Sequence, residues 1–366
     1  MTMSTRIPIL DLQPQIEAHW DEFNAAFQRV MRSGQFILGP EEKAFEQECA
    51  TYLGVKHAIG VNSGTDALYI AMRALNIGPG DEVITTPFTF FATAEAISHV
   101  GATPVFVDIE ESTFNIDPDL IPAAITERTK AIIPVHLFGR PCDMDRIQTI
   151  AAQHGLNIVE DCAQSFGATW KGRKAGLMGT FGCYSFFPTK NLNAFGDGGM
   201  ITTDDEELAA YARMLRVHGS RKKYFNETVG YNSRLDELQA ALLRVKLPHI
   251  ERWNAGRIKV AEVYGALLAG ARDIVTPEMT PGHVFHQYTL RVQAGKRDEL
   301  QAQLAEAGVD TMVYYPVPVH RLKLYSASHA TITCPVAEQA AREVLSLPIW
   351  PELKPKLQEY IFHALA

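Results

Sequence analysis

The chain has 366 residues, of which 46% are hydrophobic and 21% charged, a composition typical of an ordinary globular protein. Its formal net charge of −8 argues against a nucleic-acid-binding surface. No apolar run reaches membrane length, and residues 1–12 lack the apolar core of a signal peptide, so we expect a cytoplasmic protein with no membrane contact. The five cysteines are scattered and form no CxxC pair, which predicts buried, reduced thiols and no metal site.

Three parts of the chain differ in pattern. Residues 1–30 are too few to fold alone and are expected to pack on the main body. Residues 31–250 alternate short apolar runs with segments of helical periodicity, and this alternation predicts a large α/β domain with a mainly parallel, doubly wound sheet. Ligands of such sheets bind at the carboxyl ends of the strands. The predicted strands are 58–61, 82–85, 104–108, 131–135, 157–160 and 180–186.

From residue 251 to residue 366 the pattern changes to that of a smaller α+β unit, which we predict to be a second, C-terminal domain. Its predicted elements are a helix over 251–269, a strand over 287–292, a helix over 297–307 and a strand over 309–315.

Residues 61–68 predict the end of a strand, a small polar turn and the start of a helix. Ser63 and Asp66 match the capping pattern of a helix start. Free N–H groups and the helix dipole at such a point attract anions, Gly64 lets the backbone approach closely, and Thr65 adds a hydroxyl donor. A simple helix cap accounts for the same residues, so the motif alone leaves both interpretations open.

Asp161 ends the apolar run that begins at Ile158, and a carboxylate there is costly to bury without a positive partner. The protonated ring nitrogen of a cofactor is one such partner. Asp108 ends a similar run, and the local chemistry does not choose between them.

Lys190 follows an apolar, glycine-containing segment over 182–189 and lies in a loop after a predicted strand. Removal from bulk water disfavours the ammonium form and lowers the pKa of a lysine. A neutral amine can form a Schiff base with a carbonyl group. An ordinary surface lysine is the alternative interpretation.

A third segment, residues 230–239, predicts another capped helix start at Ser233 and Asp236. Asn232 and Arg234 then lie at the mouth of that helix, where an anion can bind. A solvated arginine without a ligand is the alternative.

Together these segments resemble one family, the DegT/DnrJ/EryC1/StrS sugar aminotransferases, which are fold-type-I enzymes that use pyridoxal phosphate (PLP). The resemblance runs from residues 34–40 to residues 315–318, nearly the whole chain. The matching motifs, in the order expected, are Ser63-Gly64-Thr65-Asp66-Ala67-Leu68, residues 86–93, residues 160–168, residues 185–190 and Gly230-Tyr231-Asn232-Ser233-Arg234.

The resemblance implies roles for these residues. Lys190 would hold PLP as a Schiff base and then move a proton between the substrate carbon and the cofactor. Asp161 would keep the pyridine nitrogen protonated, which decides against Asp108 by analogy alone. Asn232 would reach the phosphate across the interface of a homodimer with shared active sites. The remaining cofactor contacts would be Phe90 stacked on the ring, Gln164 near its phenolic oxygen, and Gly64, Thr65 and Ser185 at the phosphate.

The implied reaction is a ping-pong transamination from L-glutamate to a ketosugar carried on a nucleoside diphosphate. Arg221, Arg234 and His320 are candidate substrate contacts, although solvated arginines and a structural histidine are the alternatives. Residues 218–247 look most like members acting on dTDP-linked 3-keto-6-deoxyhexoses, while a 4-keto sugar or a UDP-linked 3-keto sugar acid remains open.

Three rival functions differ in what they require of the sequence. Related PLP-dependent sugar dehydratases replace the lysine with histidine, and this chain has Lys190. A non-catalytic PLP-binding regulatory protein on the same fold is the rival from another class. A nicotinamide enzyme lacks support because no GxGxxG motif follows a predicted strand.

Overall fold

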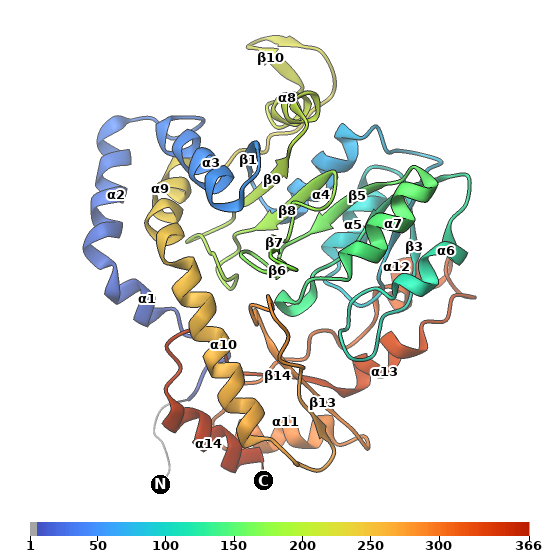
Figure 1. Ribbon diagram of the computed structural model, residues 1–366. Helices are drawn as coiled ribbons and strands as arrows, with labels where there is room; N and C mark the ends of the chain where they lie inside the picture. The colour runs from blue at the N-terminus through green and yellow to red at the C-terminus, as the bar shows by residue number, and fades with distance from the viewer. Residues whose placement is uncertain (1–5, 366) are drawn as a thin grey trace.

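A seven-stranded sheet forms the centre of the molecule in the computed structural model, which describes residues 6–365 (Figure 1). Its strand order is β1-β9-β8-β5-β4-β2-β3, and all strands run parallel except β9, which is antiparallel to both of its neighbours. The predicted α/β fold with a mainly parallel sheet is therefore confirmed. The strands are β1 (His57–Val61), β2 (Glu82–Thr85), β3 (Thr103–Phe106), β4 (Thr129–Ile133), β5 (Asn157–Asp161), β8 (Phe181–Ser185) and β9 (Gly199–Thr203).

Alternation of side chains along each strand explains why helices cover both faces of this sheet. Within β5, Val159 packs into one core cluster and Ile158 into another, and Val83 and Ile84 of β2 separate in the same way. The helices on the first face are α4 (Gly64–Ala74), α5 (Ala92–His99) and α8 (Glu206–Leu215); those on the second are α3 (Pro40–Leu53), α7 (Met144–His154) and α9 (Glu237–Lys246).

The C-terminal part has its own sheet and its own core (Figure 1). Strands β12 (Ile274–Val275), β13 (Tyr288–Val292) and β14 (Val344–Leu347) are antiparallel and pack with α10 (Ile250–Leu267), α11 (Arg297–Glu306) and α14 (Pro355–Leu365). The predicted strand over 309–315 is wrong, because this segment makes only isolated bridges, at Val309 and at Met312. Strands β9 and β14 were not predicted.

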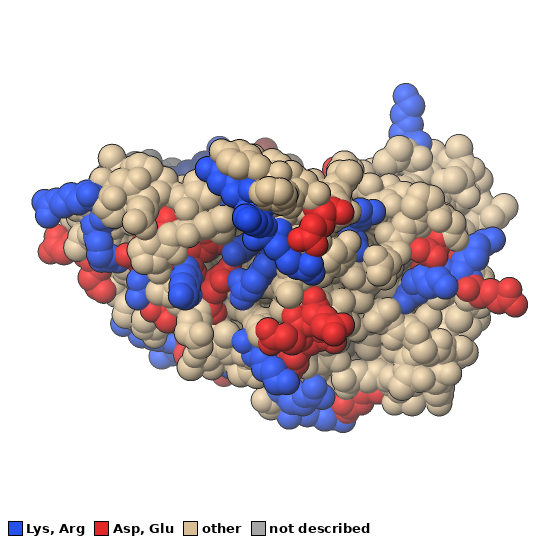
Figure 2. Space-filling model, turned by 90° about the horizontal axis from the view of Figure 1, so that it is seen from above, with Lys and Arg blue, Asp and Glu red and all other residues tan. Residues whose placement is uncertain are grey.

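Besides the N-terminal helices, the chain forms several further elements, most of them short. They are α6 (Ile121–Ala124), α12 (Lys323–Ser326), α13 (Pro335–Glu343) and two small hairpins, β6 (Thr169–Trp170) with β7 (Arg173–Lys174) and β10 (Ser220–Lys222) with β11 (Phe225–Asn226). The second hairpin projects from the top of the molecule in Figure 1. Figure 2 looks down on this end and shows basic side chains grouped beside acidic ones.

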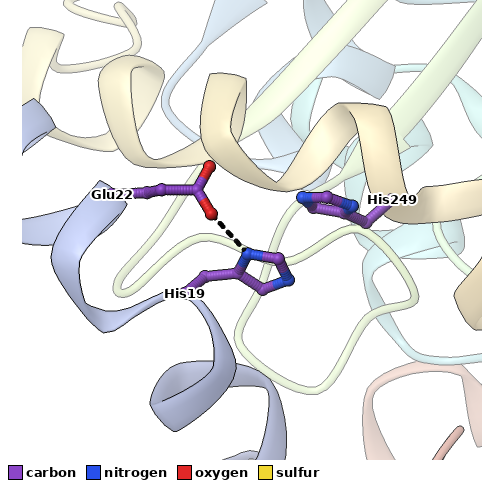
Figure 3. A group of neighbouring side chains, drawn as sticks. All are labelled: His19, Glu22 and His249. Atoms are coloured by element: carbon purple, nitrogen blue, oxygen red, sulfur yellow. Dashed lines mark hydrogen bonds and ion pairs between the residues drawn. The ribbon is translucent and has the colours of Figure 1, made fainter.

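The N-terminal helices α1 (Gln13–Ala18) and α2 (Trp20–Ser33) pack along the body of the protein, where apolar residues of α2 meet Ala241 and Leu242 of α9. His19, between the two helices, stacks on His249 with ring centroids 4.1 Å apart (Figure 3). Its Nδ1 pairs with Glu22 at 2.8 Å and its Nε2 lies 3.5 Å from the guanidinium of Arg252. Both ring nitrogens therefore have partners in this contact between the N-terminal segment and the start of α10.

None of the helices in residues 6–365 combines the length and the apolarity that crossing a membrane requires. All five cysteines are free and buried, as predicted.

Candidate active site

A cavity of about 550 Å³ opens at the carboxyl ends of β5 and β8. Its size is that of a small-molecule site. The structure brings together there the predicted residues from four separate motifs: Gly64, Thr65, Phe90, Asp161, Gln164, Ser185 and Lys190 all line the cavity.

One wall of the cavity is the N-terminus of α4. The Oγ of Ser63 accepts a hydrogen bond from the backbone N–H of Asp66 at 3.1 Å, so the helix starts at a capped turn as the sequence predicts. A side chain at Gly64 would place its Cβ 2.7 Å from the Cβ of Ser185, so β8 passes too close for any other residue. The remaining N–H groups, with the hydroxyls of Thr65 and Ser185, form a cradle suited to a phosphate group.

Asp161 ends β5 with its carboxylate in the cavity and is only 5% exposed. It accepts one hydrogen bond from the Thr93 hydroxyl at 2.8 Å and one from the Ala163 N–H at 3.1 Å. Burial raises the pKa of this carboxyl, against the opposing effects of Thr93, Ala163 and the charge of Lys190. A buried carboxylate with two neutral donors has room for a positive partner.

Glu160, the preceding residue, shows what a fully satisfied buried carboxylate looks like. It accepts hydrogen bonds from the N–H groups of Gly176, Met178 and Gly179 at 2.5–2.8 Å, and its Oε2 lies 2.9 Å from the Nε2 of His136. The carboxylate oxygens of Glu160 are thus all engaged in hydrogen bonds that fix the backbone, so only Asp161 of these two residues is available to a ligand.

Lys190 lies in the loop after β8 and lines the same cavity as Asp161. Its backbone N–H donates to the carbonyl of Phe187 at 2.8 Å, which closes the turn that carries the side chain. Burial lowers the pKa of Lys190 to about 8, while the charge of Asp161 opposes the shift. About a tenth of this amine is therefore neutral and nucleophilic at pH 7, far more than for an ordinary lysine.

Phe90 and Gln164 complete the part of the cavity that the sequence predicted. Phe90 is 59% exposed, so a large aromatic face is free to stack on a ring. Gln164 is buried, and its Oε1 accepts from the N–H of Phe138 at 2.6 Å. Its Nε2 donates to the hydroxyl of Tyr315 at 3.1 Å and keeps a second proton for a ligand.

The model of the DegT/DnrJ/EryC1/StrS aminotransferase family matches residues 18–366. The chain belongs to this family. The predicted resemblance is confirmed, and with it the fold-type-I architecture.

The names of proteins similar to this chain describe more than one function. A pleiotropic regulatory protein of Geobacillus stearothermophilus is 53% identical, with 98% of each chain covered. A UDP-N-acetyl-3-dehydro-α-D-glucosamine 3-aminotransferase of Acidithiobacillus ferrooxidans is 49% identical over 97% of this chain and 95% of the relative. A dTDP-3-amino-3,4,6-trideoxy-α-D-glucose transaminase of Streptomyces venezuelae is also 49% identical, over 95% and 92%.

Among solved structures, that of S. venezuelae DesV in complex with a ketimine intermediate superposes on this family member with a TM-score of 0.95 at 48% identity. The match covers 99% of this chain and 98% of that one.

The cofactor of this aminotransferase is PLP, as predicted. The residues present fit it: the α4 N-terminus suits the phosphate, Asp161 lacks a positive partner, and Phe90 offers a free ring face. Lys190 lines the same cavity and offers an amine, the kind of group that can bind an aldehyde such as that of PLP.

Among the cavity residues that were not singled out from the sequence, three bear on the site. Thr93 lies one helical turn beyond Phe90 and holds Asp161, and its signal was already present in the motif over 86–93. His286 and Tyr315 come from the C-terminal part of the chain. Nothing in their local sequence marks them, since only the fold carries them to the cavity.

Four predicted residues lie outside the cavity within one chain. Asn232 is exposed. Arg221 pairs with Glu227 in the projecting hairpin at 2.7 Å, and Arg234 is partly buried. His320 is buried, with its Nε2 3.1 Å from Glu338, and burial lowers its pKa. The roles given to these four residues stay predictions.

Proposed function

We propose that this protein moves an amino group from L-glutamate to a ketosugar carried on a nucleoside diphosphate, with a dTDP-linked 3-keto-6-deoxyhexose as the first choice. The observation that carries the proposal is the shared cavity of Lys190, Asp161 and the α4 N-terminus. The names of the two 49%-identical relatives support a 3-keto sugar, one on UDP and one on dTDP.

The chain's own residues divide the work between them. When bound, PLP supplies an electron sink for negative charge on the carbon that bears the amino group. Lys190, with its lowered pKa, would act as the base that moves a proton between that carbon and the cofactor. Asp161 would pair with the ring N–H and keep it protonated, while Thr93 holds the carboxylate in place. Phe90 covers the ring and limits the access of water.

We further propose an isologous homodimer in which Asn232 of one subunit reaches the phosphate site of the other. The exposed position of Asn232, outside its own cavity, supports this arrangement. In the dimer, Arg234 would bind the glutamate carboxylate, Arg221 the sugar diphosphate and His320 the sugar. The five free cysteines agree with a reducing compartment, so we propose a cytoplasmic location.

Mixed dimers of Lys190→Ala and Asn232→Ala subunits test the shared site. If Asn232 acts across the interface, each heterodimer keeps one intact site, and random mixing restores about a quarter of wild-type activity. If Asn232 acts within its own chain, every site carries a defect and no activity returns. Native mass spectrometry of the mixture confirms that heterodimers are present.

An absorption spectrum of the PLP-loaded protein, before and after L-glutamate, tests the proposed reaction. We expect a band near the visible edge that moves toward the ultraviolet as the cofactor takes the amino group. Adding dTDP- and UDP-linked 3-keto and 4-keto sugars in turn should return the band, fastest with the true acceptor. A protein unmoved by glutamate and by other amino donors would contradict transamination.

The name of the 53%-identical relative favours one second function, regulation by a PLP-bound protein. A purely regulatory protein would show the band without turnover on any ketosugar. The same titration therefore separates the two functions.

A further inference from the structure

Two threonine hydroxyls in the cavity wall form a hydrogen-bonded pair that ends at Asp161. The Oγ1 atoms of Thr89 and Thr93 lie 3.0 Å apart, and the Oγ1 of Thr93 lies 2.8 Å from the Oδ2 of Asp161. Thr89 is 3% exposed and Thr93 1%, and both residues line the cavity. Within residues 6–365 neither hydroxyl has another hydrogen-bond partner, so these three side chains account for both hydroxyl protons.

The direction of both hydrogen bonds follows from a count of protons. An ionised carboxylate can only accept, and each threonine hydroxyl carries one proton. The proton of Thr93 is donated to Asp161, so the Thr93 oxygen has to accept in its contact with Thr89. Thr89 is therefore the donor of the threonine pair, and its donation leaves Asp161 as the acceptor for the proton of Thr93.

The backbone places the two threonines beside the proposed stacking residue. Thr93 lies in the first turn of α5, and its N–H donates to the carbonyl of Phe90 at 3.2 Å. Thr89 directly precedes Phe90 in the loop that follows β2. One short segment thus supplies the exposed ring face of Phe90 and both hydroxyls, and the contact with Asp161 links this segment to the end of β5.

Asp161 depends on hydrogen-bond donors because it is buried. Burial raises its pKa, and the hydrogen bond from Thr93 is the largest opposing effect, ahead of a backbone N–H and of the charges of Lys190 and His136. A hydroxyl that accepts a hydrogen bond is polarised and donates more strongly. Thr89 can therefore act on the carboxylate through Thr93, without a hydrogen bond of its own to Asp161.

We propose that Thr89 is a positioning residue for the cofactor site: it donates to Thr93 and directs the proton of Thr93 to Asp161. This threonine relay, formed by Thr89 and Thr93, holds the carboxylate as an acceptor, so that the proton shared with the ring nitrogen of PLP stays on the nitrogen. The proposal rests on the role proposed above for Asp161. It does not depend on which sugar accepts the amino group.

The direct test is the ¹⁵N NMR signal of the ring nitrogen in protein loaded with ¹⁵N-labelled PLP, because protonated and unprotonated nitrogens differ in chemical shift. Without donation from Thr93 the carboxylate binds the shared proton more tightly, so Thr93→Val should shift the proton equilibrium toward Asp161 by about tenfold. Thr89→Val should shift it in the same direction by about twofold, because only the polarisation of Thr93 is lost. Thr89→Ser keeps the donor and should restore the wild-type signal.

The variant Thr85→Val is the matched control. Thr85 is also buried and lies close in sequence, but its hydroxyl donates to the carbonyl of Ile133 at 2.9 Å and the residue does not line the cavity. Its replacement should leave the ring-nitrogen signal unchanged. A wild-type signal in Thr89→Val would overturn the proposal and leave Thr89 as a packing residue, and an equal shift in Thr85→Val would overturn it as well.

Rates of the two half-reactions complete the test. The ring nitrogen serves both, so Thr93→Val should slow the glutamate step and the ketosugar step by similar factors of about ten, and Thr89→Val by factors of about two. A loss confined to one step would overturn the relay and assign the hydroxyls to that substrate.

The same measurements separate the relay from the proposed function. An unprotonated ring nitrogen in the wild-type protein would overturn the role of Asp161 and the relay together. A protonated nitrogen in a protein that accepts no ketosugar would contradict the proposed function alone, while the signals of the threonine variants still test the relay.

Discussion

Two lysines of this chain are withdrawn from water, and comparing them shows what distinguishes the one proposed to be catalytic. Burial lowers the pKa of Lys190 to about 8 and that of Lys246, on α9, to about 7. The size of the shift does not distinguish them, and the residue with the larger shift lies outside the cavity. Their hydrogen bonds do distinguish them.

Lys246 is 1% exposed and fully engaged. Its Nζ donates to the backbone oxygen and to the Oδ1 of Asn193, each at 2.9 Å, and lies 3.8 Å from the ring centroid of Phe195. Asn193 in turn donates to the carbonyl of Pro188 at 2.6 Å, just before Lys190. The Nζ of Lys190 has no hydrogen bond to any of residues 6–365 and opens on the cavity. Lys190, whose amine has unused donors and faces an open cavity, is thus available for chemistry. Lys246 instead uses its amine to fix the loop that contains Asn193.

The largest expected effect follows from replacing the cavity lysine. Lys190→Ala should reduce turnover by about 10³-fold or more, because the variant loses both the covalent attachment of PLP and the proton carrier. Circular dichroism and the unfolding midpoint should change little, since Lys190 makes no side-chain hydrogen bond. Steady-state rates with L-glutamate and the best ketosugar give the measurement. If Lys190→Ala turned over at close to the wild-type rate, the proposed role of Lys190 as the Schiff-base lysine would be wrong.

The reverse outcome is expected when the structural lysine is replaced. Lys246→Met leaves two oxygens of Asn193 without their donor, which should lower the free energy of unfolding by about 1–3 kcal/mol. Turnover of the folded enzyme should stay close to wild type, because Lys246 does not line the cavity. Urea unfolding and initial rates on the same preparation measure both quantities. If Lys246→Met had the stability of wild type but no turnover, the assignment of Lys246 as the structural lysine would be wrong.

Sequence reasoning reached several residues that line the cavity, some through short motifs whose chemistry is local and others, Phe90, Gln164 and Ser185, only through the family resemblance. Gly64 and Thr65 open a capped helix, and Lys190 follows an apolar strand, so their positions relative to the sheet could be predicted. The domain boundaries near residues 30 and 250 stay predictions.

The choice between Asp108 and Asp161 shows where this reasoning stops. Asp108 accepts hydrogen bonds from the N–H groups of Val336 and Ala337, each at 2.9 Å, and so caps α13. These partners are more than 200 residues away in sequence. His286 was missed for the same reason, because only the fold carries it to the cavity. The role proposed for Asn232 depends on a second subunit, which the sequence suggests only through its family.

The smallest expected effect is a pH dependence of stability that belongs to Lys246. Its folded pKa of about 7 lies below the value of about 10.4 expected for an unfolded chain. Below pH 7 both states hold the proton, and the folded state bears the full cost of a buried ammonium. Between these two values the unfolded state binds more protons, so the contribution of Lys246 to folding becomes more favourable as pH rises.

The difference in unfolding free energy between wild type and Lys246→Met should therefore grow in favour of wild type from pH 7 to pH 9, by at most about 1.4 kcal/mol per pH unit. Urea midpoints of the apoproteins at several pH values measure it. If this difference in unfolding free energy does not change with pH, the oxygens of Asn193 and the ring of Phe195 stabilise the ammonium of Lys246 as well as water does. Lys246 would then stay charged in the folded protein, and the two lysines would differ in charge as well as in hydrogen-bond partners.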